Sequence, residues 1–253
     1  MTKLNEFYKQ RAKKHWITQG DRNTTFFHQA VTKRRRRNRI TSIMDSQGQD
    51  IFDPQEIANE FITYFRNIFQ SSCPSHGRPA IFSVINHDEQ EYTNSIPDKD
   101  EIWSIIKDMK KDASPGPDGF NVGFYRNAWS WIAEDITQLV RTFYETGNMP
   151  PKLNETHIAL IPKKLVCHLP SDFRPISLCN VIYKIISKSL ANRLKPLLAD
   201  YIHPSQQAFI EGRRISDNII AAQEIAHSFS LKSFKKQCFM LKIDLAKAFD
   251  RLE

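Results

Sequence analysis

The chain has no long apolar run, and this absence argues against a membrane-spanning protein. No stretch of the 253 residues approaches the roughly 20 apolar residues that cross a bilayer. The polar, basic beginning, residues 1–5, also lacks the apolar centre of a signal peptide. We therefore expect an intracellular protein with no membrane partner, located in the nucleus or, as the alternative, in the cytoplasm.

Cysteine is scarce and irregularly placed. The four cysteines include no Cys-x-x-Cys pair, which argues against a zinc ribbon and against a disulfide framework and predicts four reduced thiols. Cys167 and Cys179 lie in the same part of the sequence as His157 and His168. Their spacing matches no common metal site, so we predict no zinc here.

The overall composition is that of a folded protein. With 40% hydrophobic and 25% charged residues, the chain suits one or two globular domains with a real core. We place a boundary near residue 92, between a basic arm with a helical linker region (1–92) and a second domain (93–253).

Positive charge is concentrated near the beginning of the chain. Residues 1–40 hold 12 Lys and Arg against 2 acids, which leaves 24 basic and 26 acidic residues in the rest. The densest run places six cations between Lys33 and Arg39, where they repel one another unless a polyanion lies alongside. RNA or DNA is the expected partner, with a solvated helix face or a nuclear localisation signal as alternatives. The arginines in question are Arg34, Arg35, Arg36, Arg37 and Arg39.

Local patterns predict several helices and one hairpin. Asp53 and Asp98 are expected helix N-caps, and residues 156–161 and 176–178 are expected to pair as strands. Asn180 should cap a helix that ends or kinks at Pro196. Apolar spacing predicts the buried faces of these helices, with Ile57, Phe61, Phe65 and Ile68 on the first, Ile102, Ile105, Ile106 and Met109 on the second, and Val181, Ile185, Ile186, Leu190 and Leu194 on the third. Two further helices are expected. One has Trp129, Ile132 and Ile136 on its apolar face and ends at Gly147, and the other covers about residues 217–229.

The stretch 239–250 alternates apolar and polar residues and carries one carboxylate. Phe239, Leu241 and Ile243 share one face of the predicted strand, so Asp244 points to the other face. An acid at the end of a strand is a candidate ligand for Mg²⁺. Taken alone, the pattern equally describes a buried strand that ends in a turn.

Four further motifs precede this strand in a fixed order. They are Pro115-Gly116-Pro117-Asp118-Gly119-Phe120, Leu160-Ile161-Pro162-Lys163-Lys164, Phe173-Arg174-Pro175-Ile176-Ser177-Leu178 and Gln206-Gln207-Ala208-Phe209-Ile210. Together with residues 239–250, this series resembles the reverse transcriptases of LINE-type (non-LTR) retrotransposons, particularly plant ones. Residues 16–28 and the arginine run resemble the segment that precedes the polymerase in that family.

The resemblance implies a fold and a reaction. The fold would be α+β, mostly helical with short antiparallel strands, and would comprise the fingers and the start of the palm of a right-hand polymerase. The reaction would be RNA-directed DNA polymerisation, with an RNA template, a DNA primer and dNTPs as partners. Its cofactor would be Mg²⁺ or Mn²⁺ in the complete enzyme, bound by the Asp244 carboxylate and the backbone carbonyl of Leu245.

The same resemblance implies roles for other residues. Lys163 and Arg174, and less firmly Lys164, would hold the triphosphate, because charge develops on the leaving pyrophosphate. Phe249 would exclude a ribose 2′-hydroxyl, or it simply fills the base of a turn. Template and primer contacts would come from two loops, with surface solubility and simple turns as the alternatives. These residues are Gly116, Asp118, Gly119, Gln206, Gln207, Arg213 and Arg214.

The family's second catalytic motif, which contains an Asp-Asp pair, does not occur in the sequence. Two-metal phosphoryl transfer needs carboxylates from both motifs. We therefore expect this polypeptide alone to be inactive, and its strand at 239–245 to be an exposed edge that favours self-association. The alternative function is a non-catalytic basic module, derived from a retroelement, that binds RNA or DNA.

Overall fold

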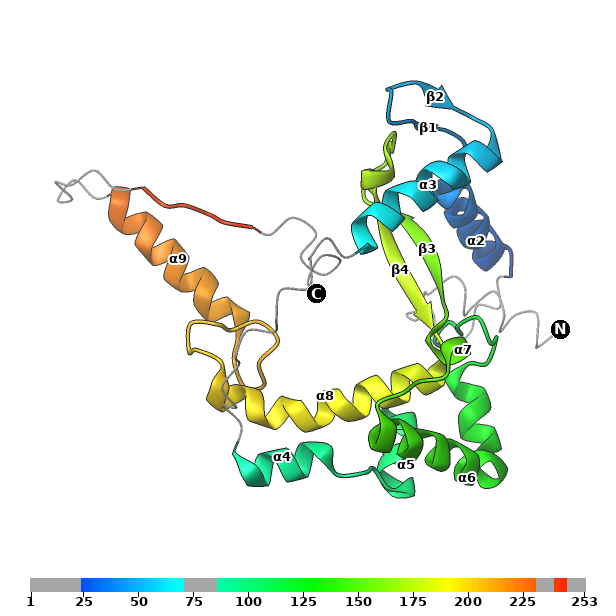
Figure 1. Cartoon of the computed structure of the whole chain (residues 1–253). Helices are drawn as coiled ribbons and strands as arrows, with labels where there is room; N and C mark the ends of the chain where they lie inside the picture. Colours follow the sequence, from blue (N-terminus) through cyan, green and yellow to red (C-terminus); the bar gives the residue numbers. More distant parts are fainter. Residues whose placement is uncertain (1–23, 71–85, 231–238, 245–253) are drawn as a thin grey trace. The chain divides into compact units, whose positions relative to one another are not determined.

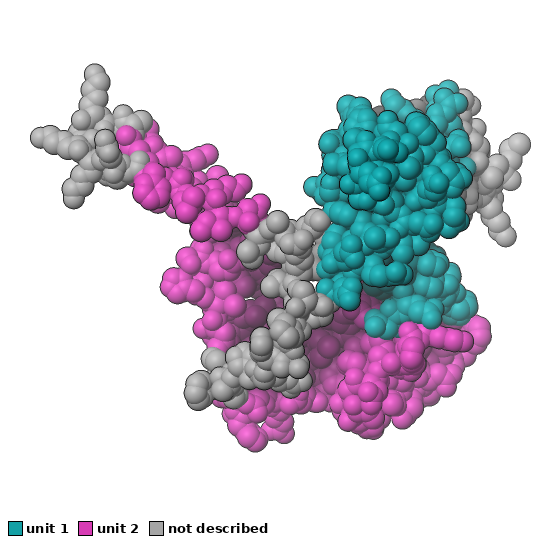
Figure 2. Space-filling model, turned by 45° about the horizontal axis from the view of Figure 1, so that its top comes forward, with its two compact units in different colours: residues 1–71, 110–124, 154–180 teal, residues 72–109, 125–153, 181–253 magenta. Residues whose placement is uncertain are grey.

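A computed structural model describes residues 24–70, 86–230 and 239–244 (Figure 1). The chain forms two compact units, each assembled from several segments (Figure 2). Unit 1 comprises residues 1–71, 110–124 and 154–180, and unit 2 comprises residues 72–109, 125–153 and 181–253. These units are not consecutive halves of the chain, and the boundary near residue 92 stays a prediction.

The described part of unit 1 contains two helices, two short antiparallel sheets and a 3-10 turn. The elements are α2 (Thr24–Asn38), β1 (Ile43–Met44), β2 (Asp50–Ile51), α3 (Pro54–Phe69), β3 (Thr156–Pro162), η1 (Pro170–Asp172) and β4 (Phe173–Cys179). β1 pairs with β2, and β3 pairs with β4. The predicted hairpin is confirmed, and its strands are longer than the apolar runs that indicated them.

The hairpin β3–β4 has one face in the core of unit 1. Phe173 is buried and meets the ring of Phe61 edge to face, with 5.2 Å between the centroids. Ile43, Ile57 and Phe65 complete this core. α3 begins where expected, because a carboxylate oxygen of Asp53 accepts hydrogen bonds from the backbone N–H groups of residues 55 and 56. Local capping and apolar spacing therefore placed this helix correctly.

Unit 2 is helical. It contains α4 (His87–Asn94), α5 (Lys99–Asp108), most of α6 (Val122–Thr146), α7 (Pro151–Asn154), α8 (Val181–Tyr201) and α9 (Ile215–Ser230). The core residues of α5 and α8 are nearly inaccessible to solvent, and they are Ile102, Ile105, Ile106, Val181, Ile185 and Ile186. α6 ends as predicted at Gly147, which has a φ of 70° and donates its N–H to the Phe143 carbonyl.

A buried polar cluster joins four helices of unit 2. Arg193 of α8 is 4% exposed and pairs with Glu101 of α5 at 2.8 Å. Its guanidinium also donates to the carbonyls of Thr93 and Ser95 and lies over the ring of Tyr144. Because a buried charge is costly unless it is paired, this cluster fixes where the segment after α4 lies against α8.

Several expectations need correction. Leu190 and Leu194 are 37% and 44% exposed, because the buried face of α8 continues through Ser189 and Arg193, one position before each of them. α8 continues through Pro196 to Tyr201, so the helix does not end at this proline, and the alternative of a kink there stays a prediction. Met109 is half-buried at the C-cap of α5.

The predicted strand at 239–245 is not formed over the part that the structure describes. Residues 239–244 have no strand hydrogen bonds and are exposed. A strand needs a partner for its backbone groups, and both described sheets are complete pairs without them. Self-association through an edge strand therefore has no structural support.

None of the described helices is long and apolar enough to cross a membrane.

Candidate nucleic-acid interface

The loop between β3 and β4 is organised by Asp172. One carboxylate oxygen accepts from the backbone N–H groups of residues 168 and 169, at 3.0 and 3.1 Å, and the other lies 2.9 Å from the Lys164 ammonium. The bond from Lys164 is the largest cause that lowers the pKa of Asp172 to about 2, below its ordinary 3.8. No motif in the sequence pointed to Asp172, although an acid just before a strand is a common loop anchor.

The predicted triphosphate ligands lie at this end of the hairpin. Lys163 donates its backbone N–H to the Asp172 carbonyl and its ammonium to the Ser171 carbonyl, at 2.8 and 2.7 Å. Arg174 lies opposite Ile161 in the strand register and is exposed. Within the described residues, the Arg174 side chain makes no hydrogen bond or ion pair. Arg174 is therefore the most accessible of the three cations for an incoming anion.

The turn at residues 115–119 is built tightly against the end of β4. Its hydrogen bond runs from the Gly119 N–H to the Gly116 carbonyl at 3.1 Å, and Gly119 has a φ of 76°. Asn180 is 1% exposed, and its Oδ1 accepts from the Asp118 N–H at 3.1 Å. A Cβ atom on Gly116 would overlap the backbone nitrogen and Oδ1 of Asn180. Gly116 is therefore required because a Cβ atom has no room, whereas Gly119 is favoured because its φ is positive.

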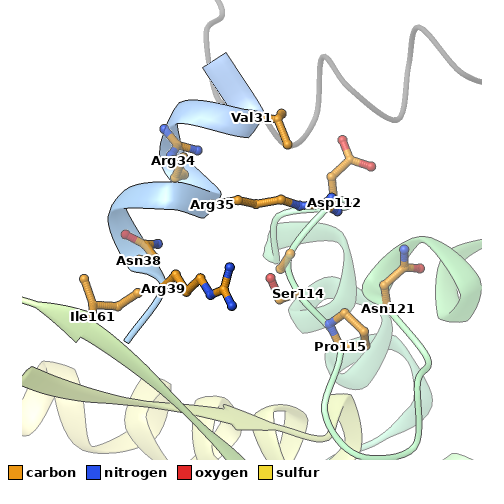
Figure 3. Close-up of a pocket in the computed structure, with 11 residues that line it drawn as sticks. Val31, Arg34, Arg35, Asn38, Arg39, Asp112, Ser114, Pro115, Asn121 and Ile161 are labelled. Atoms are coloured by element: carbon orange, nitrogen blue, oxygen red, sulfur yellow. The ribbon is translucent and has the colours of Figure 1, made fainter. Parts of the chain in front are cut away.

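Unit 1 also contains a basic cavity of about 730 Å³ (Figure 3). Arg34, Arg35 and Arg39, from α2 and the residue after it, line one side, and residues 112–115 with Asn121 line the other. Arg35 and Arg39 extend from the helix toward this loop (Figure 3). The structure thus brings part of the arginine run together with the segment that leads into the Gly116 turn.

The hairpin contributes to the same region through Ile161, which also lines the cavity. Residues that are directly opposite in an antiparallel pair point to the same face, so Arg174 shares a face with Ile161. Phe173, next along the strand, points to the other face and into the core. The hairpin thus has an apolar face toward α3 and a face with Arg174 toward the cavity.

The predicted contacts at 206–214 have mixed surroundings. Gln206 and Gln207 each donate to a backbone carbonyl within their own loop, at 3.2 and 3.0 Å. The Arg213 guanidinium donates to four backbone carbonyls, those of residues 199, 202, 203 and 206, at 2.8–2.9 Å. Arg214 is exposed. Arg213 therefore holds the end of α8 against the loop, a role that the sequence did not reveal.

Asp244, the candidate metal ligand, is exposed and lies in unit 2, whereas Lys163 and Arg174 lie in unit 1. Among the described residues, no group of three or more His, Cys, Asp or Glu side chains is placed to hold a metal ion. Leu245 and Phe249 lie outside the described residues.

Comparisons with known proteins identify the class. Residues 161–253 match the reverse transcriptase (RNA-dependent DNA polymerase) family. This segment includes the β3–β4 loop and Asp244. This part of the chain is therefore similar to reverse transcriptases, as the resemblance predicted.

Most of the chain is also similar to proteins of retrotransposable elements. It is 29% identical over 241 residues to an uncharacterized 149 kDa protein of transposon TX1 from Xenopus laevis, covering 92% of this chain and 18% of that protein. It is 27% identical over 213 residues to the Pol polyprotein of the type-2 retrotransposable element R2DM from Drosophila melanogaster, covering 84% of this chain and 19% of the relative. The chain thus spans about a fifth of the length of these relatives, and the LINE-type resemblance is confirmed.

Proposed function

We propose that this chain contributes the fingers and the start of the palm of an RNA-directed DNA polymerase in a non-LTR retrotransposon. The observation that carries the proposal is the reverse transcriptase match over residues 161–253. That segment folds in part as a hairpin whose loop end presents three cations, Lys163, Lys164 and Arg174. RNA template, DNA primer and dNTPs are the proposed partners.

Nucleotide binding is assigned first to Arg174. A guanidinium can hold two phosphate oxygens at once, which suits a triphosphate. Lys163 and Lys164 already bond to Ser171 and Asp172, so they supply positive potential and a fixed loop beside that site. Phe249 is proposed to exclude a 2′-hydroxyl and so to favour dNTPs.

Asp244 and the carbonyl of Leu245 are proposed as two of several ligands for Mg²⁺ or Mn²⁺. A single exposed carboxylate does not fit a catalytic two-metal centre, which needs acids from more than one element. No chemical step is therefore assigned to a metal bound by this chain alone.

Template and primer contacts are proposed for two groups of residues. The first is the arginine run with the neighbouring turn, and the second is the loop around Gln206 and Gln207 with Arg214. Arg213 was a candidate phosphate ligand, but its bonds to four carbonyls favour the task of fixing that loop. The turn residues of the first group are Gly116, Asp118 and Gly119.

Photocross-linking of a labelled dNTP to the 253-residue chain tests the nucleotide site. We expect cross-links within residues 163–174, and we expect Arg174→Gln to weaken them about tenfold or more, because a charged hydrogen bond contributes about 1.5–3 kcal/mol. Arg141→Gln, at an exposed arginine of α6, removes the same charge elsewhere and should have no effect. Equal losses in the two variants would show that the hairpin has no special part in nucleotide binding.

A non-catalytic basic module that binds RNA or DNA is the second candidate. It is favoured by the concentration of positive charge in residues 1–40 and by the arginine-lined cavity. Retained binding of RNA, together with complete absence of dNTP cross-links to the hairpin, would select this function over the first. Primer extension on an RNA template would select the first.

A further inference from the structure

α2 presents two different basic faces. The cavity-lining residues Val31, Arg34, Arg35, Asn38 and Arg39 follow a spacing of three and four, which is one face of a helix. Lys33, Arg36 and Arg37 fall on the opposite face and are exposed. The densest charge run in the chain is therefore divided, and its two parts meet different surroundings.

The cavity is suited to an anion. Its lining carries three arginines against one acid, Asp112, toward which Arg35 extends (Figure 3). Asn121 adds a donor, because its Oδ1 accepts from the Phe124 N–H at 2.9 Å while the described residues offer its NH₂ group no acceptor. Arginine forks and amide donors of this kind match phosphate oxygens.

The size and the apolar part of the cavity limit what the anion can be. A volume of about 730 Å³ falls within the range of about 300–1,000 Å³ of small-ligand sites, which holds roughly one or two nucleotides of an unpaired strand but no double helix. Val31, Pro115 and Ile161 give an apolar floor against which a sugar can lie. No aromatic residue is among the lining residues, so base stacking, the usual source of base contact with single strands, is not available here.

We infer that this cavity holds the sugar–phosphate backbone of an unpaired nucleic-acid strand, with Arg35 and Arg39 as phosphate ligands. The inference rests on the proposed nucleic-acid function and adds a place and a strand state to it. The template and primer contacts proposed above for the whole arginine run are thereby narrowed to its cavity face, and Arg36 and Arg37 on the outward face contribute long-range attraction without a defined contact.

Two double variants of the 253-residue chain separate the faces. The cavity pair, Arg35→Gln with Arg39→Gln, changes the cavity lining. The outward pair, Arg36→Gln with Arg37→Gln, changes the outward face of α2. Each double variant lowers the formal net charge from +8 to +6. Fluorescence anisotropy would measure the affinity for unpaired RNA, unpaired DNA of the same sequence and duplex RNA over a range of salt concentrations. Circular dichroism would check that all four positions, which are exposed, tolerate the change.

The cavity pair should weaken binding of the unpaired strand on the order of tenfold, and should lower the salt slope by roughly 0.7 for each phosphate group that the variant no longer neutralises. The outward pair should change the affinity about twofold at most, because Arg36 and Arg37 do not line the cavity and attract the strand only over distances at which salt screens the charge. Equal affinity for unpaired RNA and DNA would assign the site to phosphate alone, and a preference for RNA would add an interaction with the 2′-hydroxyl. Both results support the inference.

Three results would overturn it. Equal losses of affinity from the cavity pair and the outward pair of substitutions would show only general electrostatic attraction. Binding of duplex RNA as tightly as the unpaired strand would contradict the size argument. Photocross-links that avoid residues 112–115 would place the strand elsewhere. The dNTP cross-links at residues 163–174 do not depend on α2, so their presence or absence judges the proposed polymerase function separately.

Discussion

The Gly116 turn offers the sharpest test of how the cavity wall is held. In Gly116→Ala, the new Cβ would overlap the backbone nitrogen and Oδ1 of Asn180 and lie 2.6 Å from the Cys179 carbonyl carbon. These are mostly backbone atoms at the junction of β4 and α8, so they cannot move aside as a flexible side chain would. The turn itself must shift away from Asn180.

The expected cost follows from two effects. Forcing an extra carbon into a packed site costs about 1–3 kcal/mol, and losing the hydrogen bond from Asp118 to the buried Asn180 adds about 1 kcal/mol. We therefore expect Gly116→Ala to lower the free energy of unfolding by about 2–4 kcal/mol. The shift should also reduce binding of unpaired nucleic acid, because Ser114 and Pro115 of the cavity wall precede the turn.

Gly119 is the matched control within the same turn. Its Cβ would meet nothing within 4 Å, but its φ of 76° is unfavourable for alanine, so Gly119→Ala should cost only about 1 kcal/mol. Asn tolerates that backbone conformation, so Gly119→Asn should recover part of the loss, whereas Gly116→Asn should be at least as harmful as Gly116→Ala. Urea unfolding followed by circular dichroism would measure these differences, and amide exchange at Asp118 would localise them. If Gly116→Ala were as mild as Gly119→Ala, the close approach to Asn180 would be wrong.

Three further predictions concern stability. Arg193→Ala should lower the free energy of unfolding by about 2–4 kcal/mol, because Glu101 loses its charge partner and keeps the hydrogen bond from Ser189, and two carbonyls lose a donor. Lys99→Ala, which breaks an exposed ion pair, should cost at most about 1 kcal/mol in the same urea titration. The pKa of Asp172 is lowered from 3.8 to about 2, so the ionised carboxylate stabilises the fold above about pH 4, and this stabilisation is lost as the pH falls toward 2. Asp172→Asn should flatten this part of a plot of the free energy of unfolding against pH, and an unchanged plot would contradict the role of Asp172 as a loop anchor. Arg213→Ala should lower the melting temperature while Arg214→Ala leaves it unchanged and weakens RNA binding instead, and the reverse pattern would restore Arg213 as a phosphate ligand.

Much of the local structure could be predicted from the sequence. The N-caps at Asp53 and Asp98, the buried apolar faces that follow them and the end of α6 at Gly147 all agree with the structure. Each depends on groups within about four residues of one another, which is the range of helix hydrogen bonds and caps. The strand at 239–245 failed because alternation describes a strand's faces but cannot supply a pairing partner.

What the sequence determined by itself is the similarity to reverse transcriptases, the positive arm and the places of several helices and of the β3–β4 hairpin, since these depend on residue types and short spacings. The tertiary structure alone decided which charges are already engaged. It joined Arg213 to four carbonyls and Asn180 to a turn 62 residues earlier, and it divided the arginines of α2 between a cavity and an outward face. Those outcomes depend on contacts between segments far apart in the chain, and a one-dimensional pattern contains no information on which of several available partners a side chain will meet.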